Sequence, residues 1–180
     1  MEFIETGFEG LWVIQPKIFE DPRGYFYESY NKQVFDLKFP GINFVQDNQS
    51  ESDYKVLRGL HFQSPPHSQI KLIRVIKGAV LDVVVDVRKT SRTYGKHFKI
   101  ELTDRNKTMI WIPVGFAHGF ATLEDKSIFL YKCSSVYNKA SEYCLSWNDP
   151  DLNIDWNIDS PLISEKDRQG IAFNQLPDLF

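Results

Sequence analysis

The chain has 180 residues, of which 42% are hydrophobic and 14% aromatic, and its formal net charge at pH 7 is −3. This length and composition exclude a disordered chain and predict a single globular domain over residues 1–180 with a sizeable core. Acidic and basic residues are interspersed without a basic stripe, which argues against binding to nucleic acid or to a membrane surface.

Short strands separated by turn residues dominate the chain, a pattern that predicts an all-β barrel or sandwich. The sequence Asp21-Pro22-Arg23-Gly24 has the residue order that a type I turn prefers, so it would join two strands as a hairpin. In chain order, the predicted strands are Leu11–Pro16, Tyr25–Tyr30, Lys71–Arg88 with a break at Lys77-Gly78, Phe98–Leu102, Thr108–Ile112 and Ile128–Ser135.

Two short helices are predicted outside these strands. One spans Asn31–Lys38, and the other lies near Ser164–Gly170, after a stretch rich in Asp, Asn and Pro. Ser164 is a candidate N-cap, and Asp167 stands at the third helical position, so the two resemble a capping box. On this pattern alone, Asp167 has a structural role.

The clearest alternation of side chains follows the break at residues 77–78. Leu81, Val83 and Val85 share one face of the predicted strand, whereas Asp82 and Asp86 lie on the other. Period two of this kind predicts one buried face and one partly polar face. Because neither carboxylate has an evident partner in the sequence, both are interpreted as structural.

The protein is expected to be cytoplasmic. The first five residues include acids where a secretory signal peptide would carry basic residues. No apolar run reaches the ~20 residues of a membrane-spanning helix. The only cysteines, Cys133 and Cys144, are too few for a disulfide framework and favour a reducing compartment.

Two of the four histidines stand in glycine-punctuated β segments, His61 in Leu57–Gln63 and His118 in Trp111–Phe120. A neutral imidazole can accept a proton at neutral pH, although a histidine on a strand is more commonly structural. On an ideal strand, Arg58 would face away from His61 unless the strand twists or bulges there. The remaining two, His67 and His97, are expected to be exposed to solvent.

Lys71 and Tyr131 each have two interpretations. Lys71 is either a solvated lysine at a strand end or, if it faces the same cavity as His61, a cation that stabilises an oxyanion. Tyr131 fits the pattern of an aromatic residue that fills a barrel. A single histidine flanked by Arg58 and Lys71 indicates a proton-transfer site rather than a metal site.

The spacing Pro113-x-Gly115-x-x-His118 resembles the second motif of the cupin superfamily. Metal-binding cupins carry His-x-His and a later glutamate in their first motif. This chain has His61-Phe62-Gln63 instead, and no glutamate lies between His61 and Gly78. Because a metal needs three or four converging ligands, we expect no metal ion here.

The whole set of ordered motifs closely resembles the dTDP-4-dehydrorhamnose 3,5-epimerase family, from about Ile14 to about Asp167. The motifs are Phe19-Glu20-Asp21-x-Arg23-Gly24, Gln46-Asp47-Asn48-x-Ser50, Leu57-Arg58-Gly59-Leu60-His61-Phe62-Gln63, Val85-Asp86-x-Arg88, Trp111-Ile112-Pro113-x-Gly115-Phe116-Ala117-His118-Gly119-Phe120 and Tyr131-Lys132. The resemblance implies a cupin-type jelly-roll barrel with a few short peripheral helices, a homodimer, and an epimerase that uses no cofactor.

The resemblance also implies a set of catalytic residues. His61 matches the base, Asp167 the aspartate paired with it, and Tyr131 the acid. Lys71 matches a lysine near the keto oxygen of a nucleotide sugar that is a 4-keto-6-deoxyhexose attached to dTDP. Its C3 and C5 protons are both α to the C4 ketone, so one base and one acid on opposite faces would invert both centres.

Further residues match substrate contacts. Two of them, Arg23 and Glu28, would reach the nucleotide in the site of the neighbouring subunit. The contacts within one chain are Gln46, Asn48, Arg58, Lys71, His118, Glu142 and Lys166. Three alternatives remain open: an epimerase that inverts only C3 or C5 or acts on a related nucleotide 4-keto sugar, a non-catalytic cupin that binds sugar nucleotides, and a metal-dependent cupin oxygenase. The presence of both His61 and Tyr131 argues against the second, and the missing His-x-His pair argues against the third.

Overall fold

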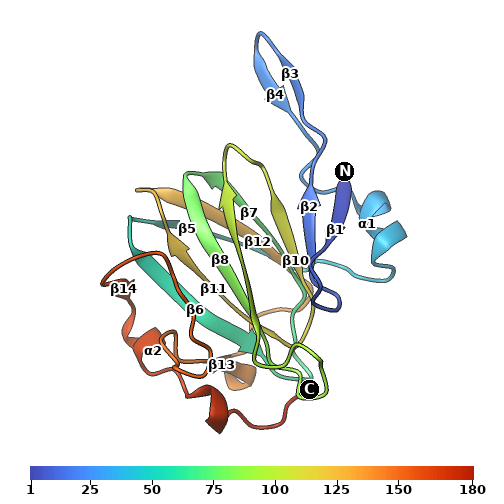
Figure 1. Cartoon of the computed structure of the whole chain (residues 1–180). Coiled ribbons are helices and arrows are strands. Elements are labelled where there is room, and N and C mark those ends of the chain that lie inside the picture. The colour runs from blue at the N-terminus through green and yellow to red at the C-terminus, as the bar shows by residue number, and fades with distance from the viewer.

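In the computed structural model, which describes residues 1–180, two six-stranded sheets face each other and enclose a core (Figure 1). The first sheet has the order β1 (Glu2–Glu5), β2 (Trp12–Gln15), β10 (Met109–Ile112), β7 (Lys71–Lys77), β12 (Ser127–Cys133) and β5 (Gln46–Ser52). The second has the order β13 (Glu142–Cys144), β6 (Val56–Gln63), β11 (Phe116–Thr122), β8 (Ala79–Asp86) and β9 (His97–Thr103), with β14 (Leu162–Ile163) paired to β6. The prediction of an all-β jelly-roll barrel is confirmed.

The helices are short and lie at the periphery: α1 (Lys32–Lys38), α2 (Glu165–Arg168), and the 3-10 turns η1 (Lys139–Ser141) and η2 (Phe173–Gln175). Ser164 caps α2, because its Oγ accepts a hydrogen bond of 3.1 Å from the backbone N–H of Asp167. The Asp167 carboxylate does not accept a hydrogen bond from the backbone N–H of Ser164, as it would in a capping box. It turns instead toward His61 on β6.

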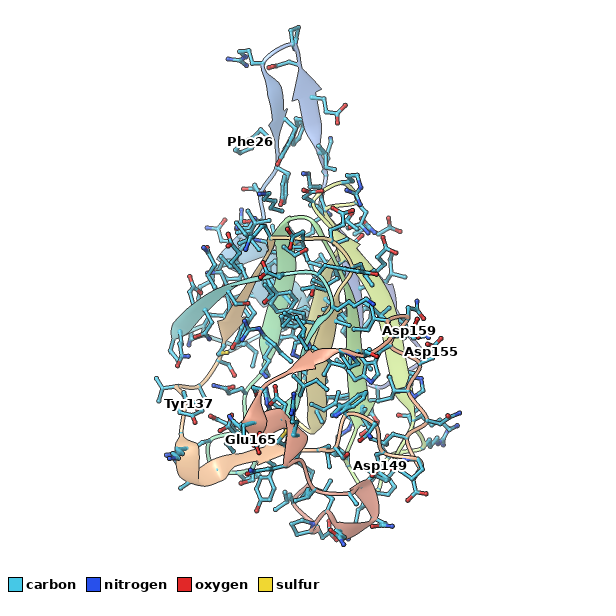
Figure 2. The ribbon with its side chains drawn as sticks, turned by 90° about the vertical axis from the view of Figure 1, so that its left-hand side faces the viewer. Phe26, Tyr137, Asp149, Asp155, Asp159 and Glu165 are labelled. Carbon is cyan, nitrogen blue, oxygen red and sulfur yellow. The ribbon has the colours of Figure 1, made fainter.

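A two-stranded hairpin of β3 (Phe19–Asp21) and β4 (Gly24–Phe26) projects away from the barrel (Figure 1). The predicted turn is confirmed, but β4 is shorter than predicted and ends at Phe26 instead of Tyr30. The reason is the register: Phe26 pairs with Phe19, where β3 begins, so later residues have no partner strand. Phe26 is 66% exposed and lies on the stem of the hairpin, outside the barrel (Figure 2).

Three hydrophobic clusters fix the two sheets in place. The central cluster lies between the sheets and includes Ile73 and Phe129 from one sheet and Val84 and Phe116 from the other. A second cluster packs α1 on the outer face of the first sheet. A third packs the C-terminal segment, around Trp156, on the outer face of the second sheet. These layers give the barrel a rigid frame on which a site can be built.

Both faces of strand β8 are buried, since all eight of its residues are buried. The prediction that only one face would be buried is therefore wrong. Leu81, Val83 and Val85 pack under the C-terminal segment. The opposite face, which carries Asp82 and Asp86, points into the barrel, and both carboxylates are 0% exposed. Period two gave the correct faces, but it could not show that the carboxylates would be buried.

Asp86 is held by a dense set of hydrogen bonds. Arg88 donates from Nη2 to Oδ2 over 2.7 Å and from Nε to Oδ1 over 2.9 Å. The hydroxyls of Ser91 and Thr93 each donate to Oδ2 over 2.6 Å. Burial alone would raise the pKa of Asp86, but these bonds outweigh it and lower the pKa. The structural interpretation of Asp86 therefore has a physical basis.

Replacing Asp86 with asparagine is expected to lower the free energy of unfolding by about 3 kcal/mol, because Arg88 loses its buried counter-charge. The folded-state pKa is lowered, so this stabilisation is complete above the ordinary aspartate pKa of about 4 and is lost as pH falls through the folded-state value. Urea denaturation of both proteins at pH 7 and at pH 3 measures the difference. An equal difference at both pH values would contradict the assignment.

Candidate active site

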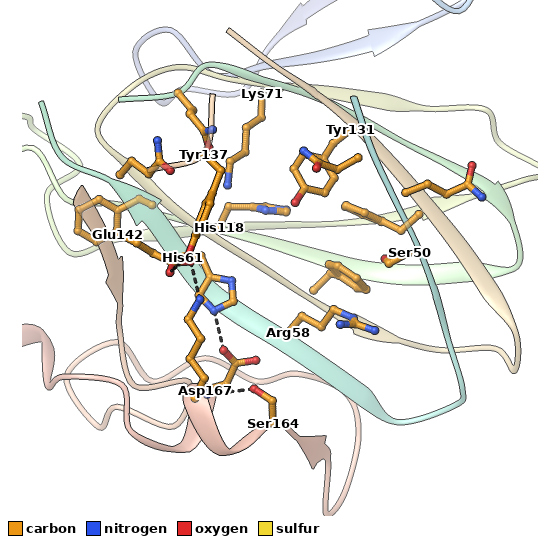
Figure 3. Close-up of a pocket in the computed structure, with 18 residues that line it drawn as sticks. Ser50, Arg58, His61, Lys71, His118, Tyr131, Tyr137, Glu142, Ser164 and Asp167 are labelled. Atoms are coloured by element: carbon orange, nitrogen blue, oxygen red, sulfur yellow. Dashed lines mark hydrogen bonds and ion pairs between the residues drawn. The ribbon is translucent and has the colours of Figure 1, made fainter. Parts of the chain in front are cut away.

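One cavity of about 430 Å³ lies between the two sheets and brings most of the predicted site residues together (Figure 3). Arg58 and His61 on β6 and His118 on β11 enter it from the second sheet. The first sheet contributes Asn48 on β5, Lys71 on β7 and Tyr131 on β12. Glu142 on β13 and Lys166 and Asp167 on α2 also line the cavity. The cavity therefore has ionisable groups on both of its walls.

Arg58 and His61 share this cavity because strand β6 is irregular between them. His61 pairs with His118 of β11, but the register then shifts before Arg58 pairs with Phe120. Gly59 stands inside the irregularity with φ +119°, a conformation that favours glycine. The bulge moves Arg58 onto the same face as His61, whereas on an ideal strand the two side chains would face opposite ways.

Replacing Gly59 with alanine is expected to destabilise the fold by about 3 kcal/mol, since strain at positive φ adds to overpacking. The new Cβ would lie 2.5 Å from Cα of Gly119 and 2.7 Å from the carbonyl oxygen of His118, neither of which is a flexible side chain. Chemical denaturation measures the loss. The control is Gly41→Ala, which also has positive φ but no atom within 4 Å of the new Cβ. Equal losses would show that the close approach is unimportant.

His61 and Asp167 form a close pair, with Nε2 of the imidazole 2.6 Å from Oδ1 of the carboxylate. Asp167 is 3% exposed, and its Oδ2 also accepts a hydrogen bond from the N–H of Gly59 over 3.5 Å. Burial alone would raise the pKa of Asp167, but the contacts with His61, Ser164 and Gly59 lower it. Because an ionised carboxylate only accepts hydrogen bonds, the proton of neutral His61 is on Nε2, and Nδ1 carries the basic lone pair.

Lys71 is 9% exposed, so the interpretation as a solvated strand-end lysine is wrong. Its Nζ lies 5.7 Å from the centroid of the Tyr131 ring, inside the cavity. Burial lowers the pKa of Lys71, and the charges of neighbouring groups oppose this effect only in part. A cation in such a dry position can stabilise a developing oxyanion strongly.

Tyr131 faces the cavity from the first sheet, on the wall opposite to His61 (Figure 3). It also packs against Phe129 of the central cluster, at 6.0 Å between ring centroids, so it partly fills the barrel as the pattern indicated. Burial raises the pKa of its phenol, although the charge of Arg58 opposes this shift. The phenol therefore remains protonated at neutral pH and can donate a proton.

His118 is buried in the same cavity and pairs with Asp82 of β8, at 2.9 Å between Nε2 and Oδ2. Burial lowers the pKa of His118, and the carboxylate of Asp82 opposes this shift. No local sequence pattern predicts this pairing, because Asp82 and His118 are 36 residues apart and meet only when β8 pairs with β11. Asp82 thus has a partner at the cavity.

At the mouth of the cavity, Glu142 accepts hydrogen bonds from Lys166 Nζ over 2.5 Å and from the Tyr137 hydroxyl over 2.9 Å. Burial alone would raise the pKa of Glu142, but these two contacts lower it. Tyr137 was not predicted. It is 52% exposed and lies at the rim, and no periodic pattern in its loop marks it (Figure 2).

The cavity does not include three of the predicted residues. Arg23 and Glu28 are exposed and lie on or next to the projecting hairpin. Gln46 supports the cavity wall instead of lining it, since its side chain donates to Asn48 Oδ1 over 2.9 Å. Two other expectations were wrong, because His67 and His97 are both half-buried. His67 is held by a 2.8 Å hydrogen bond between its Nδ1 and the Ser141 hydroxyl.

One group of side chains has the residue types of a metal site. The ligand atoms of His61, Cys144 and Asp167 all lie within 4.8 Å of one another. However, burial raises the pKa of the Cys144 thiol to about 12, and the charge of Asp167 adds to this effect. The Asp167 oxygen nearest to His61 is already engaged with Nε2. This donor set therefore does not fit a resident metal ion.

The helices of the structure are all too short or too polar to cross a bilayer.

The sequence and the fold of the chain are both similar to those of known epimerases. The family model for dTDP-4-dehydrorhamnose 3,5-epimerase matches residues 5–175 of the chain. A dTDP-4-dehydrorhamnose 3,5-epimerase from Shigella flexneri is 45% identical over 174 residues, with 96% of each chain covered. The crystal structure of a dTDP-6-deoxy-D-glucose-3,5-epimerase from Legionella pneumophila in complex with dTDP-4-keto-L-rhamnose has a TM-score of 0.93 and 41% identity, covering 98% of this chain and 94% of that one.

The same fold is also found in a protein named for a single inverted centre. The crystal structure of a 3'-monoepimerase from Streptomyces bikiniensis, in complex with dTDP-quinovose, has a TM-score of 0.90 and 33% identity. The match covers 95% of this chain and 87% of that one. Fold similarity alone therefore does not separate inversion of one centre from inversion of two.

Proposed function

Because the chain belongs to the dTDP-4-dehydrorhamnose 3,5-epimerase family, we propose that it inverts C3 and C5 of dTDP-4-dehydro-6-deoxy-D-glucose to give dTDP-4-dehydro-L-rhamnose. One observation carries the proposal: His61 and Tyr131 enter a single cavity from facing sheets. A base and an acid on opposite sides of a sugar ring are what inversion at carbon needs, since the proton must leave from one face and return to the other.

The chemistry begins with the C4 ketone, which makes the protons on C3 and C5 acidic. His61 accepts one of them at Nδ1, and the electron pair of the broken C–H bond moves to the C4 oxygen as an enolate. Asp167, at 2.6 Å from Nε2, stabilises the imidazolium that forms and keeps the ring in place. Since both protons lie next to the same carbonyl, a single base serves both centres.

Lys71 stabilises the enolate, because it is the cation buried on the cavity wall. Tyr131 then donates its phenolic proton to the carbon from the opposite face, which inverts that centre and leaves a phenolate. The phenolate takes a proton from solvent, and the imidazolium releases one to solvent. The site returns to its starting state with no net change in protons, and the same steps invert the second centre.

The remaining predicted residues would bind the nucleotide sugar. Arg58 suits the diphosphate, because a guanidinium can bind phosphate oxygens through two parallel hydrogen bonds. Asn48, with Gln46 behind it, and His118 line the part of the cavity that would hold the sugar. At the mouth, Glu142 and Lys166 would exchange part of their mutual ion pair for contacts with the substrate.

We further propose that the active form is a homodimer in which the hairpin of each chain reaches the site of its partner. Arg23 has a side chain that is 90% exposed and lies outside the cavity of its own chain. The hairpin also exposes Phe19, Tyr25 and Phe26, whose apolar surface a partner would cover. Glu28 would accompany Arg23 into the neighbouring site.

The proposed compartment is the cytoplasm. The chain has two free thiols, Cys133 and Cys144, and the first is buried whereas the second is half-buried. Thiols in this state are typical of proteins that fold in a reducing compartment.

Incubation with the 4-keto substrate in D2O tests the function and separates it from the single-centre alternative. We expect deuterium at both C3 and C5 of the product, because solvent-derived protons return to each inverted carbon. NMR of the product counts the deuterium atoms and assigns the configuration. Deuterium at one carbon alone would favour a monoepimerase, and no deuterium above a protein-free control would exclude both.

A further inference from the structure

Asp82 is a buried carboxylate whose hydrogen bonding is incomplete. It is 0% exposed, and its Oδ2 accepts a hydrogen bond of 2.9 Å from His118 Nε2. Its Oδ1 has no hydrogen-bond partner. A buried charged group without full pairing is costly to the folded state, so its presence calls for a specific reason.

The charged groups near Lys71 indicate why a carboxylate is buried here. The groups that act electrostatically on Lys71 are Cys133 of β12, Asp82 of β8, Glu142 of β13 and His118 of β11. Glu142 is already paired with a cation at 2.5 Å, namely Lys166. Burial keeps the Cys133 thiol neutral, because it raises the pKa of that group.

Asp82, in contrast, has no cationic partner of its own. Its hydrogen-bond partner is His118, and burial lowers the pKa of this histidine, so the imidazole is neutral at pH 7. A neutral ring leaves the negative charge of Asp82 uncompensated. The buried ammonium of Lys71 on the facing sheet is the cation that can balance it.

We propose that Asp82 is a positioning residue of this active site: it fixes the proton of His118 on Nε2 and supplies the negative charge that keeps Lys71 an ammonium. The catalytic consequence rests on the proposed function. With its proton on Nε2, His118 presents Nδ1 as an acceptor and binds a hydroxyl of the sugar. Lys71 is then the group that donates to the enolate oxygen.

The first test is independent of activity and uses the wild-type protein. Nitrogen-15 NMR of the histidine rings distinguishes the two neutral tautomers by the chemical shifts of Nδ1 and Nε2. We expect His118 to be neutral at pH 7 with its proton on Nε2, and a His118→Gln variant assigns the signal. A proton on Nδ1 would overturn the proposal.

The second test uses Asp82→Asn, which keeps the shape of the side chain and removes its charge. The titration of Lys71, followed by NMR of its side-chain carbon next to the amine, is expected to move down by about one pH unit. The alkaline limb of the pH profile of kcat should move down by the same amount, because the ammonium form is lost earlier. The phenol of Tyr131 does not set this limb, since burial raises its pKa.

The matched control is Asp86→Asn, on the same strand and equally buried, whose charge pairs with Arg88 away from the cavity. It should lose stability without moving either titration. A Lys71 titration that is unchanged in Asp82→Asn, or that moves equally in both variants, would overturn the proposal. Absence of epimerase activity in the wild type would overturn the proposed function instead, because both NMR measurements remain possible without it.

Discussion

Replacing His61 with asparagine is expected to lower kcat by about 10⁴-fold, the upper end of what one positioned base contributes. The amide cannot accept the proton, and both inversions use the same base, so exchange at C3 and at C5 should disappear together. Incubation of the variant in D2O, with NMR of the recovered substrate and product, measures both exchanges in one sample.

The control for this variant is His97→Asn, because His97 on β9 is a half-buried histidine that does not line the cavity. It should retain wild-type exchange. If His61→Asn kept exchange at either carbon, a second base would have to serve that centre, and the assignment of one shared base would be wrong. Circular dichroism confirms that each variant is folded.

Replacing Tyr131 with phenylalanine is expected to separate proton removal from inversion. His61 is intact in this variant, so it still removes a proton and returns a solvent-derived one to the same face. Deuterium should therefore continue to enter unreacted substrate in D2O, while formation of the inverted product falls by about 10³-fold. Time courses of both quantities, taken from the same NMR spectra, measure the two effects.

A matched control is Tyr94→Phe, since Tyr94 packs against Phe173 and lies outside the cavity. Its product formation should equal that of the wild type. Unchanged product formation in Tyr131→Phe would remove this phenol from the proposed mechanism. Parallel loss of exchange and inversion would show instead that Tyr131 acts by holding the substrate.

Hydrophobic patterning located β2, β7, β8, β9, β10 and β12, whereas β6 and β11 were recognised only as glycine-punctuated segments around a histidine, and β5 was missed. The side chains of Gln46, Asn48 and Ser50 face inward on β5, and their outward neighbours are exposed. Period two is present in this strand, but every residue is polar, so a search for apolar periodicity cannot find it. The strand is polar because one of its faces forms a wall of the cavity.

The side-chain pairs within the site could not be predicted from local patterns, for a different physical reason. His61 and Asp167 are 106 residues apart and meet only after α2 packs near β6. The local sequence pattern indicates only that Asp167 belongs to a helix cap. Its pairing with His61 was indicated by the similarity to a family and not by periodicity. The partner of His118, Asp82, was missed because no local pattern marks a contact between neighbouring strands.

The position of Asp167 in the chain has a consequence for biosynthesis of the enzyme. Both sheets are complete, apart from the short β14, by residue 144, whereas the carboxylate that orients the base arrives with α2. A ribosomal product released just before Ser164 would carry His61, Lys71 and Tyr131 but no counter-ion for the imidazole. Such a chain would also lack Leu176 and the neighbouring apolar residues that complete the third hydrophobic cluster, so the segment that supplies the counter-ion of the base also covers the second sheet.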